Sequence, residues 1–284
     1  MSREGVVDLI DEQEWLKELS ESVQPGVRKL ISSLGPLKDV LHGVWLGHPL
    51  HPALVSVPIG AWTAALVLDA LQMDEAADAA VGVGLAGAVG AAVTGLADWS
   101  ETAGADRAQR VGAMHGILNV AATTCYAFSL VQRIRGQRKS GVSLSMIGFA
   151  IASASAYLGG HLVFGEQIGV DHTATADAGK PEKFTTVLAD EKLKEGKPTR
   201  VEAEGVAIVL VRKKDRIYAL AETCTHLGGP LSEGELDEEG IRCPWHGSRF
   251  CLADGSVLNG PATFKERVFE VRVRDGEIQV RARQ

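Results

Sequence analysis

The sequence has fewer basic than acidic residues. Of its 284 residues, 29 are Lys or Arg and 36 are Asp or Glu, which gives a formal net charge of -7. An acidic chain lacks the electrostatic attraction to phosphate groups on which nucleic-acid binding depends. We therefore expect no nucleic-acid partner.

Cysteine is also scarce. The four cysteines are too few to form a disulfide framework in a chain of this length. No Cys-x-x-Cys-His segment is present, which excludes covalent attachment of a c-type haem. The first 47 residues are polar and acidic and lack a basic stretch followed by an apolar core. We therefore expect no secretory signal peptide.

Charged residues are nearly missing from four stretches, 53–71, 79–97, 111–131 and 142–164. Apart from Cys and Tyr, the ionisable residues within them are Asp69, His115 and His161. Each stretch is long enough to cross about 30 Å of hydrocarbon as a helix. A soluble all-helical domain is the alternative, but the charges gather only between the stretches. The sequence thus predicts four transmembrane helices in a multi-pass protein of the cell membrane, surrounded by lipid.

Two short segments combine Cys with His. Cys224 and His226 form Cys-x-His, and Cys243 and His246 form Cys-x-x-His further along the chain. Two Cys and two His can bind one zinc ion. They can also bind a [2Fe–2S] cluster that has two Cys on one iron and two His on the other. Zinc fingers usually pair Cys with Cys and His with His, so the mixed segments favour the cluster.

The two segments read Cys-Thr-His-Leu-Gly-Gly-Pro and Cys-Pro-Trp-His-Gly-Ser, and residues 184–284 resemble the Rieske iron–sulfur family. The resemblance implies a small antiparallel β domain with metal loops at one tip. It also implies that Cys224 and Cys243 bind a buried iron, while His226 and His246 bind an iron near the surface. Ser248 matches a family serine that donates a hydrogen bond to a cluster sulfur.

The sequence departs from the high-potential members of this family at three positions. Gly229 and Trp245 stand where those members have two disulfide-bonded cysteines, and Phe250 replaces a Tyr that donates to a cluster sulfur. Because hydrogen bonds to the sulfurs stabilise the reduced state, we expect a lower potential of the ferredoxin type. Residues 260–262, Gly-Pro-Ala, match the family's proline loop over the cluster, although an ordinary turn is the alternative.

The membrane region resembles the family called domain of unknown function 2231 over about residues 45–172. The matching motifs are His-Pro-x-Leu-Val-x-x-Pro-Ile-Gly, Thr-Gly-Leu-Ala-Asp-Trp and Gly-Gly-His-Leu-Val-Phe. The expected fold is multidomain α plus β, with a four-helix transmembrane bundle followed by the antiparallel β Rieske domain. The expected parts are an amphipathic helical segment 1–45, split in two at Pro25, the membrane domain 46–173, a linker 174–183 and the Rieske domain 184–284.

Alternating spans bring several histidines to one membrane face, where the Rieske domain follows. His115 and His161 should lie at similar depth, with His51 near them. They could bind a haem b, bind a non-haem metal, or form a polar cluster with Asp98 or Asn119, and these three alternatives stay open. The glycines of the second span either let a helix pack closely or make room for a flat cofactor.

The leading functional hypothesis is a membrane-anchored carrier that transfers one electron at a time. Its partner would be a redox protein or a quinone, and it would be a component of an oxidoreductase system. The sequence stops at Gln284, soon after His246, so we expect no room for the catalytic domain of a Rieske oxygenase. A redox sensor and a ferredoxin with an inert anchor are the alternatives. The polar N-terminal segment favours a cytoplasmic Rieske domain, although four basic residues in 133–139 lie on the opposite face.

Overall fold

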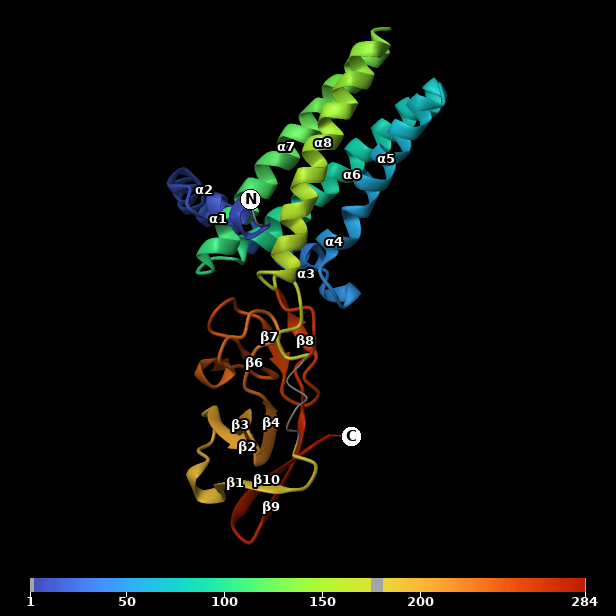
Figure 1. The fold of residues 1–284 in the computed structure, drawn as a ribbon. Helices are drawn as coiled ribbons and strands as arrows, with labels where there is room; N and C mark the ends of the chain where they lie inside the picture. The colour runs from blue at the N-terminus through green and yellow to red at the C-terminus, as the bar shows by residue number, and fades with distance from the viewer. Residues whose placement is uncertain (1–2, 175–180, 284) are drawn as a thin grey trace. The chain divides into compact units, whose positions relative to one another are not determined.

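The computed structural model describes residues 3–174 and 181–283, which form two compact units (Figure 1). One unit contains the chain up to Leu41 and Pro49–Ile168, and it is helical. The other contains His42–His48 and the chain from Gly169 on, and it is built mainly of β-strands. Of the expected linker 174–183, residues 175–180 lie outside the described residues.

The helical unit begins with the helices α1 (Arg3–Asp11), α2 (Glu14–Ser33) and α3 (Pro36–His42). The expected break at Pro25 was wrong, because α2 continues through this proline and the break lies at residues 12–13. Pro25 has no N–H group, so the carbonyl group of Glu21 has no helical partner. Glu21 is exposed, and water can reach this carbonyl group. Gln24 holds the helix in place by donating to Trp99 O at 2.7 Å, so tertiary contact outweighs the local preference.

Four helical segments long and apolar enough to cross a membrane follow, as predicted. They are α4 with α5 (Leu50–Leu54 and Ser56–Ala70), α6 (Asp74–Ser100), α7 (Asp106–Ile134) and α8 (Arg138–Phe164). The interruption between α4 and α5 has a local cause, since Pro58 has no N–H for the carbonyl group of Leu54. Helices α5 and α6 form one hairpin and α7 and α8 a second (Figure 1).

Close packing accounts for the glycines of the second span. Trp62 stacks on Tyr126 at the centre of the bundle, with ring centroids 4.0 Å apart. A Cβ atom on Gly84 would collide with the Trp62 ring, and one on Gly87 would lie 2.6 Å from Val57. These glycines therefore let α5 approach α6, which favours the packing alternative over a flat cofactor at these positions.

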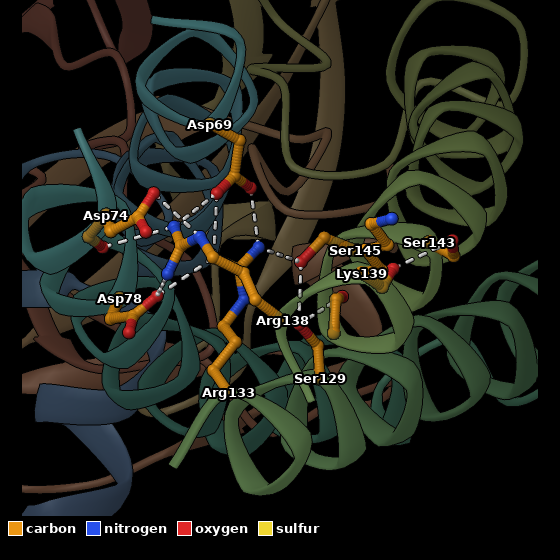
Figure 2. Close-up of polar contacts among 10 residues, drawn as sticks. Asp69, Asp74, Asp78, Ser129, Arg133, Arg138, Lys139, Ser143 and Ser145 are labelled. Carbon is orange, nitrogen blue, oxygen red and sulfur yellow. Dashed lines mark hydrogen bonds and ion pairs between the residues drawn. The ribbon is translucent and has the colours of Figure 1, made fainter. Parts of the chain in front are cut away.

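A network of ion pairs joins the helix ends at residues 69–78 and 129–145 (Figure 2). Arg133 is fully buried and binds Asp69 at 2.5 Å and Asp78 at 2.9 Å. Arg138 binds Asp69 at 2.7 Å and Asp74 at 2.8 Å. Two of the four basic residues of 133–139 are therefore neutralised by carboxylates. Buried charges need such partners, because an unpaired charge loses its hydration without compensation.

The β unit is antiparallel, as the sequence predicts, and its described residues form three sheets. One joins β1, β10 and β9, the second β2, β3 and β4, and the third β5, β6, β7 and β8. The strands are β1 (Thr185–Ala189), β2 (Thr199–Ala203), β3 (Val206–Lys213), β4 (Arg216–Ala221), β5 (Glu235–Leu236), β6 (Gly240–Arg242), β7 (Arg249–Cys251), β8 (Val257–Asn259), β9 (Phe269–Arg274) and β10 (Glu277–Ala282).

Two hairpins of this unit have very short turns. Lys213 pairs with Arg216, and Arg274 pairs with Glu277, so each turn contains two residues. All four turn residues have positive φ, as the common two-residue hairpin turns with the right-handed twist require. These hairpins and the third sheet hold the loops that carry Cys224 and Cys243.

Candidate cluster-binding site

The first Cys-His loop follows β4 and has a closed backbone. Cys224 N donates to Gly229 O at 2.9 Å, and Gly228 N donates to Cys224 O at 2.9 Å. Gly228 has φ of 79°, a conformation in which a Cβ atom would be strained. The Cys-x-His-x-Gly-Gly sequence therefore folds into a tight loop that holds the thiol and the imidazole on fixed backbone.

The second Cys-His loop, between β6 and β7, repeats the same hydrogen bonds. Cys243 N donates to Ser248 O at 2.8 Å, and Gly247 N donates to Cys243 O at 3.1 Å. Gly247 occupies the place of Gly228, with φ of 75°. Two loops of the same construction, on neighbouring parts of one unit, can thus present matching ligand pairs.

The structure brings the four side chains together as two pairs. The thiols of Cys224 and Cys243 are both buried and hydrogen-bonded to each other. The rings of His226 and His246 are 5.0 Å apart between centroids and both half-buried. In the described part of the chain, no three His, Cys, Asp or Glu side chains converge as the ligands of a single ion. Paired thiols beside paired imidazoles suit a two-iron cluster better than one tetrahedral zinc ion.

The thiols are prepared for metal binding by their surroundings. The hydrogen bond from Cys224, together with the backbone N–H groups of Trp245 and His246, lowers the pKa of Cys243. The hydrogen bond to Cys243 and burial raise the pKa of Cys224. One of the two sulfurs is therefore readily a thiolate, which is the form that binds metal. The backbone N–H groups of Trp245 and His246 donate to the Cys243 sulfur and so stabilise negative charge on it.

Ser248 and the loop at residues 260–262 lie together, as the sequence suggests. Ala262 N donates to Ser248 Oγ at 2.9 Å, and both residues are fully buried. Because the hydroxyl oxygen accepts this bond, its hydrogen atom is left to donate elsewhere. The loop at residues 260–262 is thus bonded to the second Cys-His loop through Ser248.

The two positions that carry a disulfide in high-potential relatives are packed differently here. A Cβ atom on Gly229 would lie 2.8 Å from Cys243 Sγ and 3.1 Å from the Trp245 ring. The indole therefore takes the space of a side chain at position 229. All four cysteines of the chain have free thiols. Neither position carries a cysteine, and the Trp245 ring packs against Gly229 instead.

Sequence reasoning missed two buried residues at the first loop, Thr225 within it and Glu266 in contact with it. Thr225 N donates to Glu266 Oε1 at 2.7 Å, and Thr225 Oγ1 donates to Phe264 O at 2.8 Å. Glu266 is 1% exposed, and burial raises its pKa to about 8. No short motif marks Glu266, which lies in a polar stretch that reads as surface. The contact holds the backbone between Cys224 and His226.

The membrane histidines separate into a pair and a single residue. The rings of His51 and His115 are 6.3 Å apart between centroids. His115 Nε2 lies 3.0 Å from Asn119 Nδ2, which is the polar pairing that one of the three alternatives describes. His161 Nε2 instead lies 3.1 Å from Glu166 Oε1 at the end of α8. The structure therefore brings His51 and His115 together and gives His161 a carboxylate.

Comparison with known proteins separates the chain into two matched regions. The family described as Rieske [2Fe-2S] domain matches residues 183–272, and the predicted membrane protein family DUF2231 matches residues 47–172. Ferredoxin CarAc of Metapseudomonas resinovorans is 40% identical over 95 residues, which are 33% of this chain and 89% of that protein.

Two further relatives cover the same region. The ferredoxin component of the naphthalene 1,2-dioxygenase system of Pseudomonas aeruginosa is 29% identical over 99 residues, 35% of this chain and 95% of its own. A chain in the solved complex of reduced oxygenase and oxidized ferredoxin in carbazole 1,9a-dioxygenase is 35% identical. That match covers 36% of this chain and 98% of the solved chain, with a TM-score of 0.35.

Proposed function

Because this chain belongs to the Rieske [2Fe-2S] family through residues 183–272, we propose that it is a membrane-anchored one-electron carrier of ferredoxin type. The observation that carries the proposal is the gathering of two thiols and two imidazoles on two matching loops. A [2Fe–2S] cluster bound by them supplies a centre that accepts and gives single electrons. The four long apolar helices supply the anchor.

In this proposal each residue of the site has a defined task. Cys224 and Cys243 bind the buried iron, and His226 and His246 bind the outer one. Neutral imidazoles remove negative charge from the cluster, which stabilises its reduced form relative to an all-Cys cluster. Ser248 donates to a cluster sulfur and so stabilises the reduced form further.

The half-buried imidazoles mark the side where electrons leave and enter. Trp245 is 53% exposed, and its ring lies 6.5 Å from that of His246. Exposed tryptophans often anchor a partner protein, and this one lies next to an iron-binding histidine of the proposed site. One relative is a ferredoxin and another is the ferredoxin component of a naphthalene 1,2-dioxygenase system, which supports a redox protein as the partner and a role as an electron-transfer component. A quinone in the membrane is the alternative acceptor.

The orientation we propose has the cluster domain on the cytoplasmic side. The four basic residues of 133–139 argued for the opposite orientation in sequence. Arg133 and Arg138 are bound to Asp69, Asp74 and Asp78, so only half of that positive charge is unneutralised. Positive charge retains a segment in the cytoplasm mainly near the membrane surface. The neutralised pairs weaken the opposing argument.

The electron-carrier proposal is tested with the full chain in lipid nanodiscs. The cluster is reduced with dithionite, and its reoxidation by a short-chain quinone or by an oxidised Rieske oxygenase is followed by visible absorbance. We expect one electron per chain to pass to one of the two acceptors within seconds. A cluster that reduces fully but keeps its electron against both acceptors would favour a redox sensor instead.

A further inference from the structure

The transmembrane part of the chain contains an internal repeat. Equivalent positions of its two copies are offset by 64 in sequence, which is the separation of Asp69 from Arg133 and of Asp74 from Arg138. The ends of α5 and α7, the ends of α6 and α8, and the starts of α6 and α8 all differ by this same offset. The two helical hairpins are therefore two copies of one unit.

The turns inside the two hairpins agree as well. Gln72 and Gly136 occupy equivalent positions and both have positive φ. Met73 N donates to Leu68 O, and the equivalent Gln137 N donates to Gln132 O. The repeat thus extends from the helix lengths to the backbone hydrogen bonds that end the first helix of each copy.

Equivalent glycines lie against equivalent histidines in the two copies. A Cβ atom on Gly95 would lie 2.9 Å from the His51 ring, and one on Gly159 would lie 3.1 Å from the His115 ring. Residues that touch their own equivalents lie on a pseudo-two-fold axis between the hairpins. The pairs on this axis are His51 with His115, Trp62 with Tyr126, Asp69 with Arg133, and Asp74 with Arg138.

Three of these four axial contacts are complementary. Asp69 and Arg133 carry opposite charges, and Asp74 and Arg138 do so again (Figure 2). The two aromatic rings stack with an interplanar angle of 8°. At the other end of the axis, an imidazole meets an imidazole. Two neutral imidazoles can hydrogen-bond to each other only if one ring donates and the other accepts.

The two imidazoles are held in the same way. His51 Nδ1 lies 2.8 Å from Ala91 O, and His115 Nδ1 lies 2.8 Å from Ser155 O. Ala91 and Ser155 are themselves equivalent residues of the repeat. A carbonyl oxygen only accepts, so each Nδ1 donates and each Nε2 carries the lone pair. Metal-binding histidines usually have this arrangement, because the bond at one nitrogen fixes the ring and raises the basicity of the other.

We propose that Nε2 of His51 and Nε2 of His115 bind one transition-metal centre on the pseudo-two-fold axis. Two imidazoles on opposite sides of one metal, at about 2.05 Å each, have ring centroids about 6.4 Å apart. The observed separation is 6.3 Å. The opposed arrangement is that of a haem iron, and a tetrahedral ion such as Zn²⁺ would take both imidazoles only if the two rings moved closer together. This site is separate from the cluster loops and does not depend on the proposed electron transfer.

Asn119 distinguishes the two halves of the site. Its equivalent in the first copy is Val55, which has no polar group. Asn119 Nδ2 lies 3.0 Å from His115 Nε2, so this amide must turn away when a metal binds. Replacing it with the residue of the other copy, Asn119→Val, removes the competing hydrogen bond. We expect the variant to bind the metal centre roughly 2- to 10-fold more tightly, from the net value of one hydrogen bond.

His161 provides the matched control. It lies in α8 near the same end of the bundle, but its equivalent in the first copy is Ala97. Its ring interacts with Glu166 rather than with a second imidazole. His161→Ala therefore removes one histidine from the same region without touching the axial pair.

The test uses the full chain in detergent, with its cluster content verified first. Wild type and the variants His51→Ala, His115→Ala, His161→Ala and Asn119→Val are titrated in two arms, one with haemin and one with Zn²⁺. Haemin binding is followed by its Soret band and Zn²⁺ binding by calorimetry. We expect one equivalent to bind in one of the arms, and that arm identifies the metal centre.

The variants decide whether the axial pair is the site. Binding should weaken at least tenfold in His51→Ala and His115→Ala and stay unchanged in His161→Ala. It should tighten in Asn119→Val, which misfolding could not produce. If neither arm gives one equivalent, the proposal fails. It also fails if the two axial variants bind like wild type, or if His161→Ala loses as much affinity as they do.

Discussion

Replacing Ser248 with Ala should have two separate effects. It should lower the midpoint potential of the cluster, and it should destabilise the loop that contains residue 248. The Ser248 hydroxyl is fully buried and accepts a hydrogen bond from Ala262 N at 2.9 Å. In the proposed site its hydrogen atom donates to a cluster sulfur. The reduced cluster carries one more negative charge than the oxidised cluster, so this bond is stronger in the reduced state.

The magnitude follows from that difference in bond strength. A charge-assisted hydrogen bond is roughly twice as strong as a neutral one, a difference of about 1 to 1.5 kcal/mol. For a one-electron couple, about 59 mV corresponds to a factor of ten in the equilibrium constant. Ser248→Ala should therefore lower the midpoint potential by about 40–65 mV. The orphaned N–H group of Ala262 should separately cost about 1–3 kcal/mol of stability.

Thr225 offers a control with the same kind of buried hydroxyl. Its hydrogen atom is already donated to Phe264 O at 2.8 Å, so it has none to give to the cluster. Thr225→Val should destabilise the loop without lowering the potential. The assay is a redox titration of the full chain, monitored by electron paramagnetic resonance, alongside the temperature at which the cluster absorbance is lost. The reasoning is refuted if Ser248→Ala leaves the potential within about 10 mV of wild type, or if Thr225→Val lowers it equally.

Three further predictions concern the hydrogen bonding and the charges of the two units. Phe250→Tyr should raise the potential by about 40–65 mV if its hydroxyl reaches a cluster sulfur, and a redox titration that shows no rise would place the ring elsewhere. Arg249 holds the pKa of Asp237 at about 2. Asp237 thus contributes stability above its unfolded pKa of 3.8 that is lost as pH falls towards 2, about 1 kcal/mol after allowance for its exposure. Acid titrations of wild type and Asp237→Asn should differ in that window, and superimposable curves would contradict this. Arg133→Met should lower the melting temperature in detergent more than Arg138→Met, because Arg133 is 0% exposed and Arg138 is 27% exposed, and equal losses would count against the buried network.

The sequence predicted the elements with strong local signals. The four spans follow from length and from the lack of charges, and the structure begins and ends them within a few residues of the polar boundaries. The β3–β4 and β9–β10 hairpins have a local signal of the same strength, since β-type sequence flanks the two-residue turns Lys214-Asp215 and Asp275-Gly276. The Cys-His loops could be predicted because Cys, His and Gly rarely occur together at these spacings except in metal-binding loops.

Features that depend on distant contacts were not predictable in this way. Glu266 contacts Thr225 from a distant part of the sequence, and nothing in its neighbours marks it as buried. The break at Pro25 was predicted and is absent, because Gln24 bonds to Trp99 and Thr102, which lie far along the chain. The internal repeat of the membrane helices keeps few identical residues. Most of its axial pairs consist of two different residues, such as Trp62 and Tyr126. The contacts in the structure therefore reveal a repeat that is not apparent when the two halves of the sequence are compared.

The most direct test of the central assignment is a redox titration of the full chain with electron paramagnetic resonance and iron analysis. We expect two irons per chain bound at the cluster loops and about one spin per two irons on reduction. The midpoint should fall in the range of His-ligated clusters, about -150 to +300 mV, and in its lower half. Cys224→Ser should lose the signal. A midpoint near about -400 mV, a signal that survives in Cys224→Ser, or a single zinc ion at these loops would contradict the assignment.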